Sequence, residues 1–128
     1  MEKKIILVSE KVPAAIGPYS PAVKVGKLLF ISGQLPVNPE SGNLVKGDIK
    51  KQTIQILKNL SVLLDLYSLT LKNVVKTTVF LKNMNDFSEF NTAYAQYFTD
   101  EFPTRSCIEV ARLPKDAEIE IEAIAICD

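Results

Sequence analysis

The sequence predicts one α+β domain in which two helices pack on one face of a mixed β-sheet. The hydrophobic patterns follow one another in the order β–β–α–β–α–β–β, which is typical of this two-layer architecture. The chain has 128 residues, enough for one hydrophobic core but not for two, and no linker, repeat or low-complexity tract divides it. We therefore expect residues 1–128 to form a single domain.

The apolar content predicts that the chain associates with copies of itself. Apolar residues make up 47% of the chain and the mean hydropathy is +0.12, high for a soluble protein of this size. Two helices cover only one face of the predicted sheet, so the other face needs a cover of its own. A second copy is the cover that we expect, which predicts a homo-oligomer.

The first part of the chain is predicted to hold short strands and ordered loops. An apolar run at 5–8 lies between charged residues and is typical of a first strand. This run is too short for a signal peptide or a membrane span. Residues 13–23 contain three prolines and a glycine and should form an ordered loop. A nearly continuous apolar strand follows at 27–35, and the composition of 37–47 favours a turn or small hairpin.

A long helix is predicted to follow Asp48, whose side chain is suited to an N-cap position. Apolar or small side chains at steps of three and four predict its buried face: Ile49, Thr53, Ile56, Leu57, Leu60, Leu63, Leu64 and Tyr67. The side chains between them predict its solvent-exposed face: Lys50, Lys51, Gln55, Lys58 and Asn59.

A strand and a second helix are predicted next. Residues 73–82 are rich in β-branched side chains and give the clearest strand pattern in the chain. The second helix should begin at Asp86, with Glu89 three residues on as its capping-box partner. Aromatic residues predict its apolar face: Phe87, Phe90, Tyr94, Tyr97 and Phe98.

The last part of the chain predicts two strands, 105–112 and 117–126, joined by the four-residue loop "LPKD" as a hairpin. Side chains alternate along each strand, so one face should carry the polar set: Arg105, Cys107, Glu109, Glu118, Glu120 and Glu122. The opposite face should lie under the helices with the apolar set: Ile108, Val110, Ile119, Ile121 and Ala123.

The polar face of this predicted hairpin has two interpretations, and the spacing does not decide between them. It could be a solvated or interface surface with ordinary cross-strand ion pairs. It could instead hold a partly buried Arg105 that binds a small carboxylate through a bidentate fork, with a nearby Glu that holds water. Cys107 beside this guanidinium could be a nucleophile, but no histidine accompanies it, so inert packing or a place in the wall of the site is the better interpretation.

Composition argues against several classes of partner and cofactor. Fifteen basic and fifteen acidic residues cancel, so there is no bulk electrostatic attraction to nucleic acid or anionic lipid. Zinc is not expected, because the chain has no histidine and its two cysteines, Cys107 and Cys127, lie twenty residues apart. Two thiols without a secretory signal predict reduced cysteines and a cytoplasmic protein.

Four stretches carry a resemblance to a known family: "AAIGPYSPAV", "FISGQLPVNPESG", "VVKTTVFLKNMNDFSEFNTAY" and "FPTRSCIEVARLPKDAEIEIEAIA". Together they resemble the Rid (YjgF) family of reactive-intermediate deaminases over nearly the whole chain. The RidA subgroup is the most similar, because the arginine that marks deaminase-active members is present at Arg105. The resemblance implies a chorismate-mutase-like α+β fold, assembled as a homotrimer whose sheets form an inner barrel and whose sites lie in clefts between subunits.

The resemblance also implies roles for individual residues. Arg105 would bind the substrate carboxylate, and Glu120 would position or activate the attacking water. The other positions of the family's site are occupied here by Tyr19, Ser32, Gly33, Asn91 and Cys107. Tyr19 would close the cleft, and Ser32 and Gly33 would supply a hydroxyl and a close backbone approach. Asn91 and Cys107 would line or support the pocket.

The implied reaction is the hydrolytic deamination of enamines and imines such as 2-aminoacrylate and 2-iminobutanoate to 2-keto acids and ammonia. An iminium carbon is already electrophilic, so positioning and one acid–base group suffice, and no cofactor or metal is expected. Two other functions remain open at this stage. One is an endoribonuclease or translation inhibitor, and the other is a trimer without catalysis that binds a metabolite or acts as a holdase.

Overall fold

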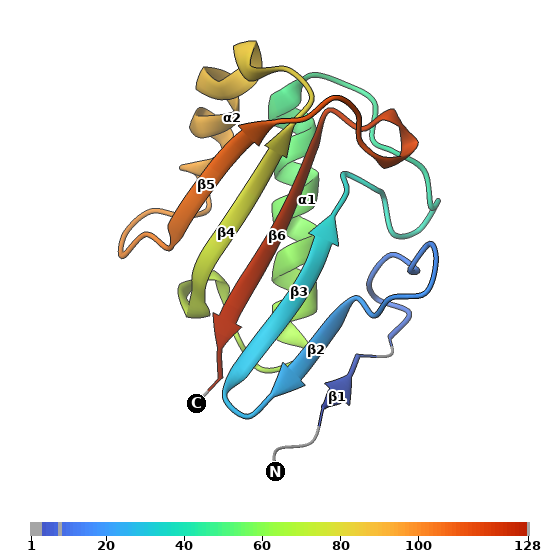
Figure 1. The fold of residues 1–128 in the computed structure, drawn as a ribbon, viewed down its shortest axis with the longest axis vertical. Coiled ribbons are helices and arrows are strands. Elements are labelled where there is room, and N and C mark those ends of the chain that lie inside the picture. Colours follow the sequence, from blue (N-terminus) through green and yellow to red (C-terminus); the bar gives the residue numbers. More distant parts are fainter. Residues whose placement is uncertain (1–3, 8, 128) are drawn as a thin grey trace.

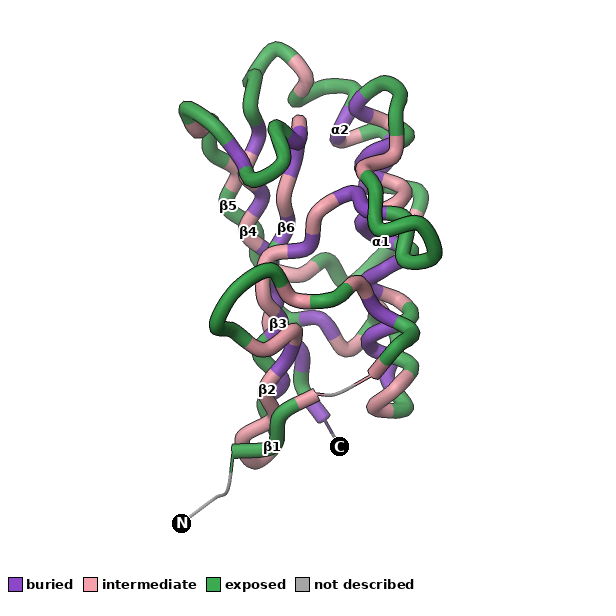
Figure 2. Tube along the Cα trace, turned by 90° about the vertical axis from the view of Figure 1, so that its right-hand side faces the viewer, coloured by how far each residue is buried: buried purple, intermediate pink, exposed green. Residues whose placement is uncertain are grey.

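The computed structural model describes residues 4–7 and 9–127, which form a six-stranded sheet with two α-helices (Figure 1). The strands are β1 (Ile5–Ile6), β2 (Ala22–Val25), β3 (Leu28–Gln34), β4 (Val74–Leu81), β5 (Thr104–Glu109) and β6 (Ile119–Ile126). The helices are α1 (Ile49–Asp65) and α2 (Phe87–Tyr94), and short 3-10 turns lie at Leu71–Asn73, Met84–Asp86 and Pro114–Asp116. Both α-helices lie on the same side of the sheet (Figure 2), which confirms the predicted fold class.

Helix α1 forms as its sequence predicts, with one exception on its outer face. The Asp48 carboxylate accepts a hydrogen bond from the Lys51 backbone N–H at 3.0 Å, so the predicted N-cap is confirmed. The predicted apolar stripe is buried from Ile49 to Leu64, with Ile56 and Leu57 fully covered, whereas Tyr67 lies beyond the end of α1 and is only partly buried. Asn59 was predicted to face solvent, which is wrong. Its amide is buried because it donates to the Val37 carbonyl at 2.8 Å and so ties the loop before α1 to the helix.

Two local predictions around the sheet need correction. The sequence pattern placed Ala22 and Val23 in a loop, but they begin β2, which pairs antiparallel with β3 across a tight turn. Gly26 supports this turn with a φ of 59°, a region that favours glycine. Helix α2 begins where predicted, after Asp86, but the Asp86 side chain makes no capping hydrogen bond, so the predicted capping box does not form.

The predicted hairpin of the last two strands is wrong, because β4 lies between β5 and β6. The strand order is β1-β2-β3-β6-β4-β5, and β5 runs parallel to β4 after the crossover through α2. Thr77 of β4 lies opposite both Arg105 of β5 and Ala123 of β6. Directly opposite residues share a face of a sheet, so Arg105 and Cys107 lie on the helix-covered face and Glu120 lies on the other.

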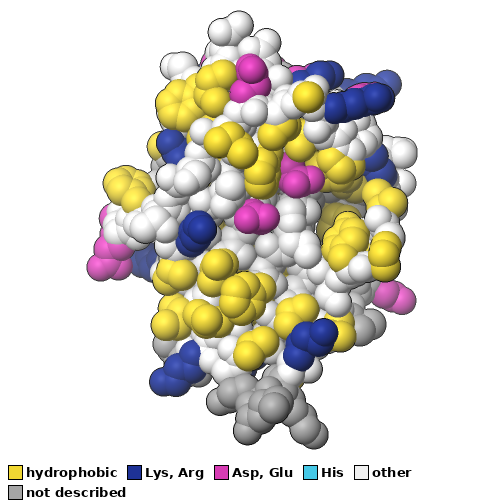
Figure 3. Space-filling model, viewed as in Figure 1, with side chains coloured by type: hydrophobic (Ala, Val, Ile, Leu, Met, Phe, Trp, Pro, Cys, Tyr) yellow, Lys and Arg dark blue, Asp and Glu magenta, His cyan; other side chains and the backbone are white. Residues whose placement is uncertain are grey.

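The sheet face away from the helices, here the open face, carries exposed apolar side chains. Leu28 and Phe30 of β3, Ile108 of β5 and Ile126 of β6 are 41%, 43%, 46% and 43% exposed. Ile108 was predicted to lie under the helices, and it lies on the open face instead because the strand order differs from a hairpin. Figure 3 views this face and shows hydrophobic side chains gathered over part of the sheet. One chain alone leaves them uncovered, and their cover by another copy stays a prediction.

Within residues 4–7 and 9–127, no helix combines the length and the apolar character needed to cross a membrane.

Candidate functional site

The Arg105 side chain packs against three aromatic rings at the outer edge of the sheet. Its Nη1 donates a hydrogen bond to Asn91 Oδ1 of α2 at 2.9 Å. Its guanidinium carbon lies 5.6, 5.3 and 4.9 Å from the ring centroids of Phe87, Phe90 and Tyr94. Cations are attracted to aromatic faces at these distances. One side of the guanidinium is therefore fixed by α2 while the side chain as a whole remains exposed.

Tyr94 connects these aromatic rings to the sheet. Its phenol oxygen lies 2.8 Å from Thr77 Oγ1 in a buried hydrogen bond, and its ring stacks on Phe98 with centroids 4.5 Å apart. Burial raises the pKa of the Tyr94 phenol above its ordinary value, and the bond to Thr77 and the charge of Arg105 oppose the rise. The sequence pattern identified Phe87, Phe90 and Tyr94 as the apolar face of α2. It gave no sign that Arg105 lies on them, because that contact depends on the parallel pairing of β5.

The Arg105 cavity, about 350 Å³ in volume, opens beside this arginine. Its lining includes Asn91, Tyr94, Phe98, Phe102, Pro103 and Arg105. A guanidinium has five N–H donors, and Asn91 accepts from one of its nitrogens. Among the described residues, Arg105 makes no ion pair with a carboxylate. The cavity thus presents a fixed, charged donor fork that suits a small carboxylate.

Cys107 lies two residues beyond Arg105 on the same face of β5 and is partly buried. Burial raises the pKa of its thiol, and the positive charge of Arg105 only partly opposes this effect. A raised pKa keeps the thiol protonated near neutral pH, which disfavours nucleophilic chemistry. This favours the interpretation of Cys107 as packing or as part of the wall of the site.

Glu120 lies against the backbone of β3 on the open face. An added Cβ at Gly33 would come 2.5 Å from Glu120 Oε2, so only glycine leaves room for the carboxylate there. The register of β3 and β6 shifts at this point, between Ile31 and Gln34. Burial raises the pKa of the Glu120 carboxyl, and repulsion from Glu122 raises it further. A carboxyl group with a raised pKa is better able to exchange protons near neutral pH than an ordinary carboxyl group.

Tyr19 and Ser32 lie close to Gly33 and already have local hydrogen-bond partners. Ser32 Oγ donates to the Ser20 carbonyl at 2.7 Å, which ties β3 to the loop that carries Tyr19. The phenol oxygen of Tyr19 accepts from the Ile16 backbone N–H at 3.3 Å, which leaves its O–H as a donor. Tyr19 is half exposed, as a residue that covers a cleft would be.

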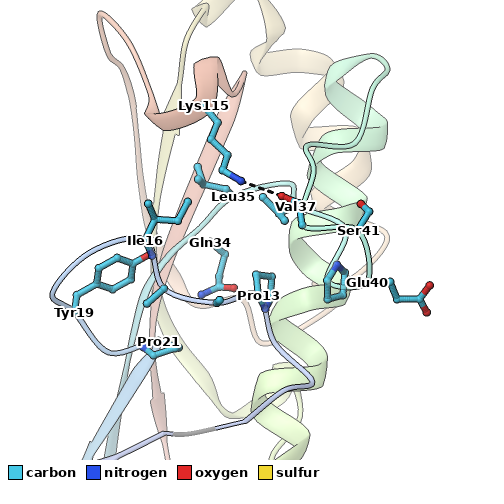
Figure 4. Close-up of a pocket in the computed structure, with 15 residues that line it drawn as sticks. Pro13, Ile16, Tyr19, Pro21, Gln34, Leu35, Val37, Glu40, Ser41 and Lys115 are labelled. Atoms are coloured by element: carbon cyan, nitrogen blue, oxygen red, sulfur yellow. Dashed lines mark hydrogen bonds between the residues drawn. The ribbon is translucent and has the colours of Figure 1, made fainter.

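A second cavity of about 360 Å³, here the Lys115 cavity, lies beside Gly33 (Figure 4). Its lining includes Pro13, Ile16, Tyr19, Gly33, Gln34 and Lys115. Gln34 and Lys115 were not among the residues that the sequence predicts for a site. No local pattern could have found them, because 81 positions along the sequence separate the two residues and only the fold brings both to one cavity.

The predicted site residues thus fall into two groups in one chain. One group lies at β5 and α2 (Arg105, Asn91 and Cys107), and the other lies at β3, at β6 and in the loop before β2 (Tyr19, Ser32, Gly33 and Glu120). The expectation that Arg105 and Glu120 share a sheet face is wrong, because β4 separates their strands and fixes opposite side-chain directions. Among the residues with described positions, no three His, Cys, Asp or Glu side chains cluster as metal ligands.

Comparison with known proteins places the chain in a family. Residues 9–127 match the Endoribonuclease L-PSP family. A RutC family protein of Pyrococcus horikoshii is 52% identical over 122 residues, 95% of this chain and 97% of that protein. The 2-iminobutanoate/2-iminopropanoate deaminase of Escherichia coli K12 is 48% identical over 123 residues, 94% of this chain and 95% of that protein. The crystal structure of E. coli TdcF with bound serine matches with a TM-score of 0.91 and 40% identity over 97% of this chain and 99% of that chain. The chain therefore belongs to the Endoribonuclease L-PSP family, the family of the YjgF and Rid proteins.

Proposed function

We propose that this protein hydrolyses reactive 2-imino and 2-enamino acids, such as 2-iminobutanoate and 2-aminoacrylate, to 2-keto acids and ammonia. The observation that carries the proposal is the Arg105 guanidinium, which is fixed by Asn91 and three rings but keeps donors for a carboxylate. A relative that is 48% identical is named for the deamination of two such imino acids, and a structural neighbour holds the amino acid serine.

The proposed site needs two copies of the chain. Arg105 and Glu120 lie on opposite faces of the same sheet, so one chain cannot place both on one small substrate. The open face, on which Glu120 lies, carries exposed apolar side chains that association would cover. In the proposed homotrimer, Arg105 of one subunit faces Glu120 of its neighbour, and three equivalent clefts result.

Imine hydrolysis requires the protein only to position the substrate and water and to transfer protons. An enamine first gains a proton on carbon and becomes the iminium ion, which is the protonated form of the imine. Arg105 holds the carboxylate, and Glu120 accepts a proton from water as the water oxygen bonds to the C=N carbon. The nitrogen of the resulting carbinolamine then takes up a proton. The C–N bond breaks and ammonia leaves, while the hydroxyl oxygen gives up its proton to water and the C=O bond of the keto acid forms.

The test is a coupled reaction with the purified full-length protein. A pyridoxal-phosphate threonine dehydratase generates 2-iminobutanoate from threonine, and semicarbazide competes for the imine. We expect the wild type to suppress semicarbazone formation, and Arg105→Ala to lose this effect while eluting at the same size. An unchanged rate in Arg105→Ala would rule out the proposed role of the guanidinium.

The same preparations separate the two other candidate functions. RNA cleavage without imine hydrolysis would favour the ribonuclease that the family's description names. Stabilisation of the protein by 2-oxobutanoate without any turnover of imine would favour a metabolite-binding protein.

A further inference from the structure

Two side chains of β5 hold α2 from the helix-covered face of the sheet. Arg105, Cys107 and Glu109 alternate along β5 and so share this face. Arg105 reaches Asn91 in the middle of α2. Glu109 Oε1 accepts a hydrogen bond at 2.8 Å from the backbone N–H of Met84, the first residue of the 3-10 turn that leads into α2. The proposed function uses the first of these contacts and leaves the second without a role.

The fold brings Glu109 to the start of α2. β4 and β5 are parallel neighbours, so both strands end at the same edge of the sheet, beside α2 (Figure 1). The chain leaves β4 after Leu81 and reaches Met84 three residues later. The contact between the strands continues past Glu109, because the Val110 backbone N–H donates to the Leu81 carbonyl at 2.9 Å. The end of β5 is therefore a fixed support, and the Glu109 carboxylate holds the turn against it.

This bond takes the place of a cap that α2 lacks. The Asp86 side chain, at the N-cap position, makes no capping hydrogen bond. α2 has eight residues, and a helix of this length depends on contacts with the rest of the protein. Its other end is held by the buried bond between Tyr94 and Thr77. Glu109 thus holds the start of a helix whose end is already fixed, and the two bonds together set the position of α2 relative to β5.

The position of α2 in turn decides what surrounds the Arg105 guanidinium. The ring centroids of Phe87 and Phe90, in the first turn of α2, lie 5.6 and 5.3 Å from the guanidinium carbon. The Phe87 backbone N–H donates to the Met84 carbonyl, so this ring follows the turn that Glu109 holds. Glu109 forms no ion pair with Arg105 in the described part of the chain, and residues four apart in a strand lie about 13 Å apart along it. Any effect of Glu109 on the guanidinium therefore passes through α2.

From these contacts we infer that Glu109 is a positioning residue for imine hydrolysis. Its carboxylate holds the start of α2 against β5, and α2 holds the Arg105 guanidinium where the substrate carboxylate binds. The effect on the substrate rests on the function proposed above, whereas the effect on the position of Arg105 does not depend on that function. Glu109 acts through its hydrogen bond to Met84 and contacts no substrate.

The kinetic test compares two substitutions at Glu109 in the full-length protein. Glu109→Ala removes the acceptor for Met84, whereas Glu109→Gln keeps an acceptor oxygen and removes only the charge. We expect Glu109→Ala to raise KM for 2-iminobutanoate by about three- to tenfold, because a misplaced guanidinium loses part of its hydrogen bonding to the substrate carboxylate. kcat should change by less than about twofold, since this binding is made in the ground state and in the transition state alike. Glu109→Gln should remain close to the wild type in both constants.

An NMR signal tests the position of Arg105 without any turnover. The chain has two arginines, so its spectrum holds two Nε–Hε cross-peaks, and the one that is absent from Arg105→Ala belongs to Arg105. The ring currents of the three rings around the guanidinium should displace this cross-peak. Glu109→Ala should move it toward the ordinary arginine position, and Glu109→Gln should leave it in place. Glu89→Ala is the matched control, because it removes an exposed carboxylate from the first turn of α2 and should change neither the cross-peak nor KM.

Two results would overturn the inference. One is an unchanged KM or an unmoved cross-peak in Glu109→Ala, and the other is a Glu109→Gln protein that is impaired as strongly as Glu109→Ala. If Glu109→Ala does not fold, Glu109→Asp replaces it, because a side chain shorter by one methylene should displace α2 in the same sense but by less. If the wild type hydrolyses no imine, the proposed function fails, and the cross-peak alone decides whether Glu109 positions Arg105.

Discussion

The region around Arg105 and the region around Glu120 prepare a charged group in opposite ways. Arg105 stays exposed, and its charge is fixed in place by aromatic faces and by Asn91. Glu120 is partly buried against Gly33, and this burial raises the pKa of its carboxyl. The first environment keeps a full positive charge available for binding. The second lowers the cost of protonating a carboxylate, so the two regions are suited to different parts of one reaction.

The largest effect should come from Glu120→Gln, which keeps the shape of the side chain but removes its proton acceptor. If Glu120 acts as the base, kcat for imine hydrolysis should fall by about 10²–10⁴-fold, with little change in the binding of a substrate analogue. Equal losses in kcat and in analogue binding would instead indicate a structural carboxylate.

Stability and pH dependence provide the controls for this variant. The raised pKa means that the folded chain holds this proton more tightly than the unfolded chain, so this group stabilises the fold at low pH. The contribution disappears as pH rises through the raised pKa. Glu120→Gln should therefore be at least as stable as the wild type at pH 7.

The acidic limb of the wild-type rate profile should lie above the ordinary carboxyl pKa of 4.5. Glu122→Gln, two residues along the same strand, should move that limb to lower pH and otherwise spare activity.

The next effect tests the close approach of β3 to Glu120. Gly33→Ala places a methyl group 2.5 Å from the present position of Glu120 Oε2, closer than the two atoms can approach, so the carboxylate must move. A displacement of about 1 Å in a catalytic group can cost about 10²-fold in rate. We expect a loss of this size in kcat with an unchanged far-UV circular dichroism spectrum. Gly17→Ala is a control for activity at a glycine where an added Cβ contacts nothing within 4 Å, although its φ of 120° adds strain. Full activity in Gly33→Ala would argue against a role for Glu120 at this position.

The smallest effect should appear on the Arg105 side, at the buried bond between Tyr94 and Thr77. Tyr94→Phe keeps the ring under the guanidinium but leaves the Thr77 hydroxyl without this partner, which should cost about 1–3 kcal/mol of unfolding free energy. Adding Thr77→Val should recover part of that loss, which denaturant titration of the single and double variants would measure. Tyr94→Leu removes the ring as well and should raise KM for the imine more than Tyr94→Phe does. Equal KM values in the two variants would show that the ring does not position Arg105.

Local sequence predicted the elements that depend on neighbouring residues. Asp48 and the apolar stripe after it specified α1, because capping and helical periodicity act within a few positions of the chain. The β-branched run of β4 and the start of α2 were equally readable, whereas Tyr97 and Phe98 of the predicted aromatic stripe lie beyond the end of α2 at Tyr94. The four-residue strand β2 was missed because it follows directly on a proline-rich loop, although its partner β3 begins only three residues after it ends.

Pairing between strands that are distant in the sequence could not be predicted from local patterns. The loop "LPKD" has the length of a hairpin loop. Its 3-10 turn nevertheless carries the chain from β5 across the end of β4, so that β6 pairs with the other side of β4. Asn59 was misplaced for a related reason, since its buried bond is made to a carbonyl twenty-two residues away. Both errors concern contacts between segments that no local preference encodes.

The sequence alone determined the kinds of secondary structure, the two-layer fold, the family and the identity of the candidate site residues. Tertiary structure decided that the Arg105 side chain packs against α2 and that Glu120 lies on the open face. It also decided that Lys115 donates a hydrogen bond to the Gly42 carbonyl beside a cavity. The reason is physical: alternation along a strand fixes which side chains share a face within that strand. Only hydrogen bonding to neighbouring strands decides toward which layer of the protein that face is turned.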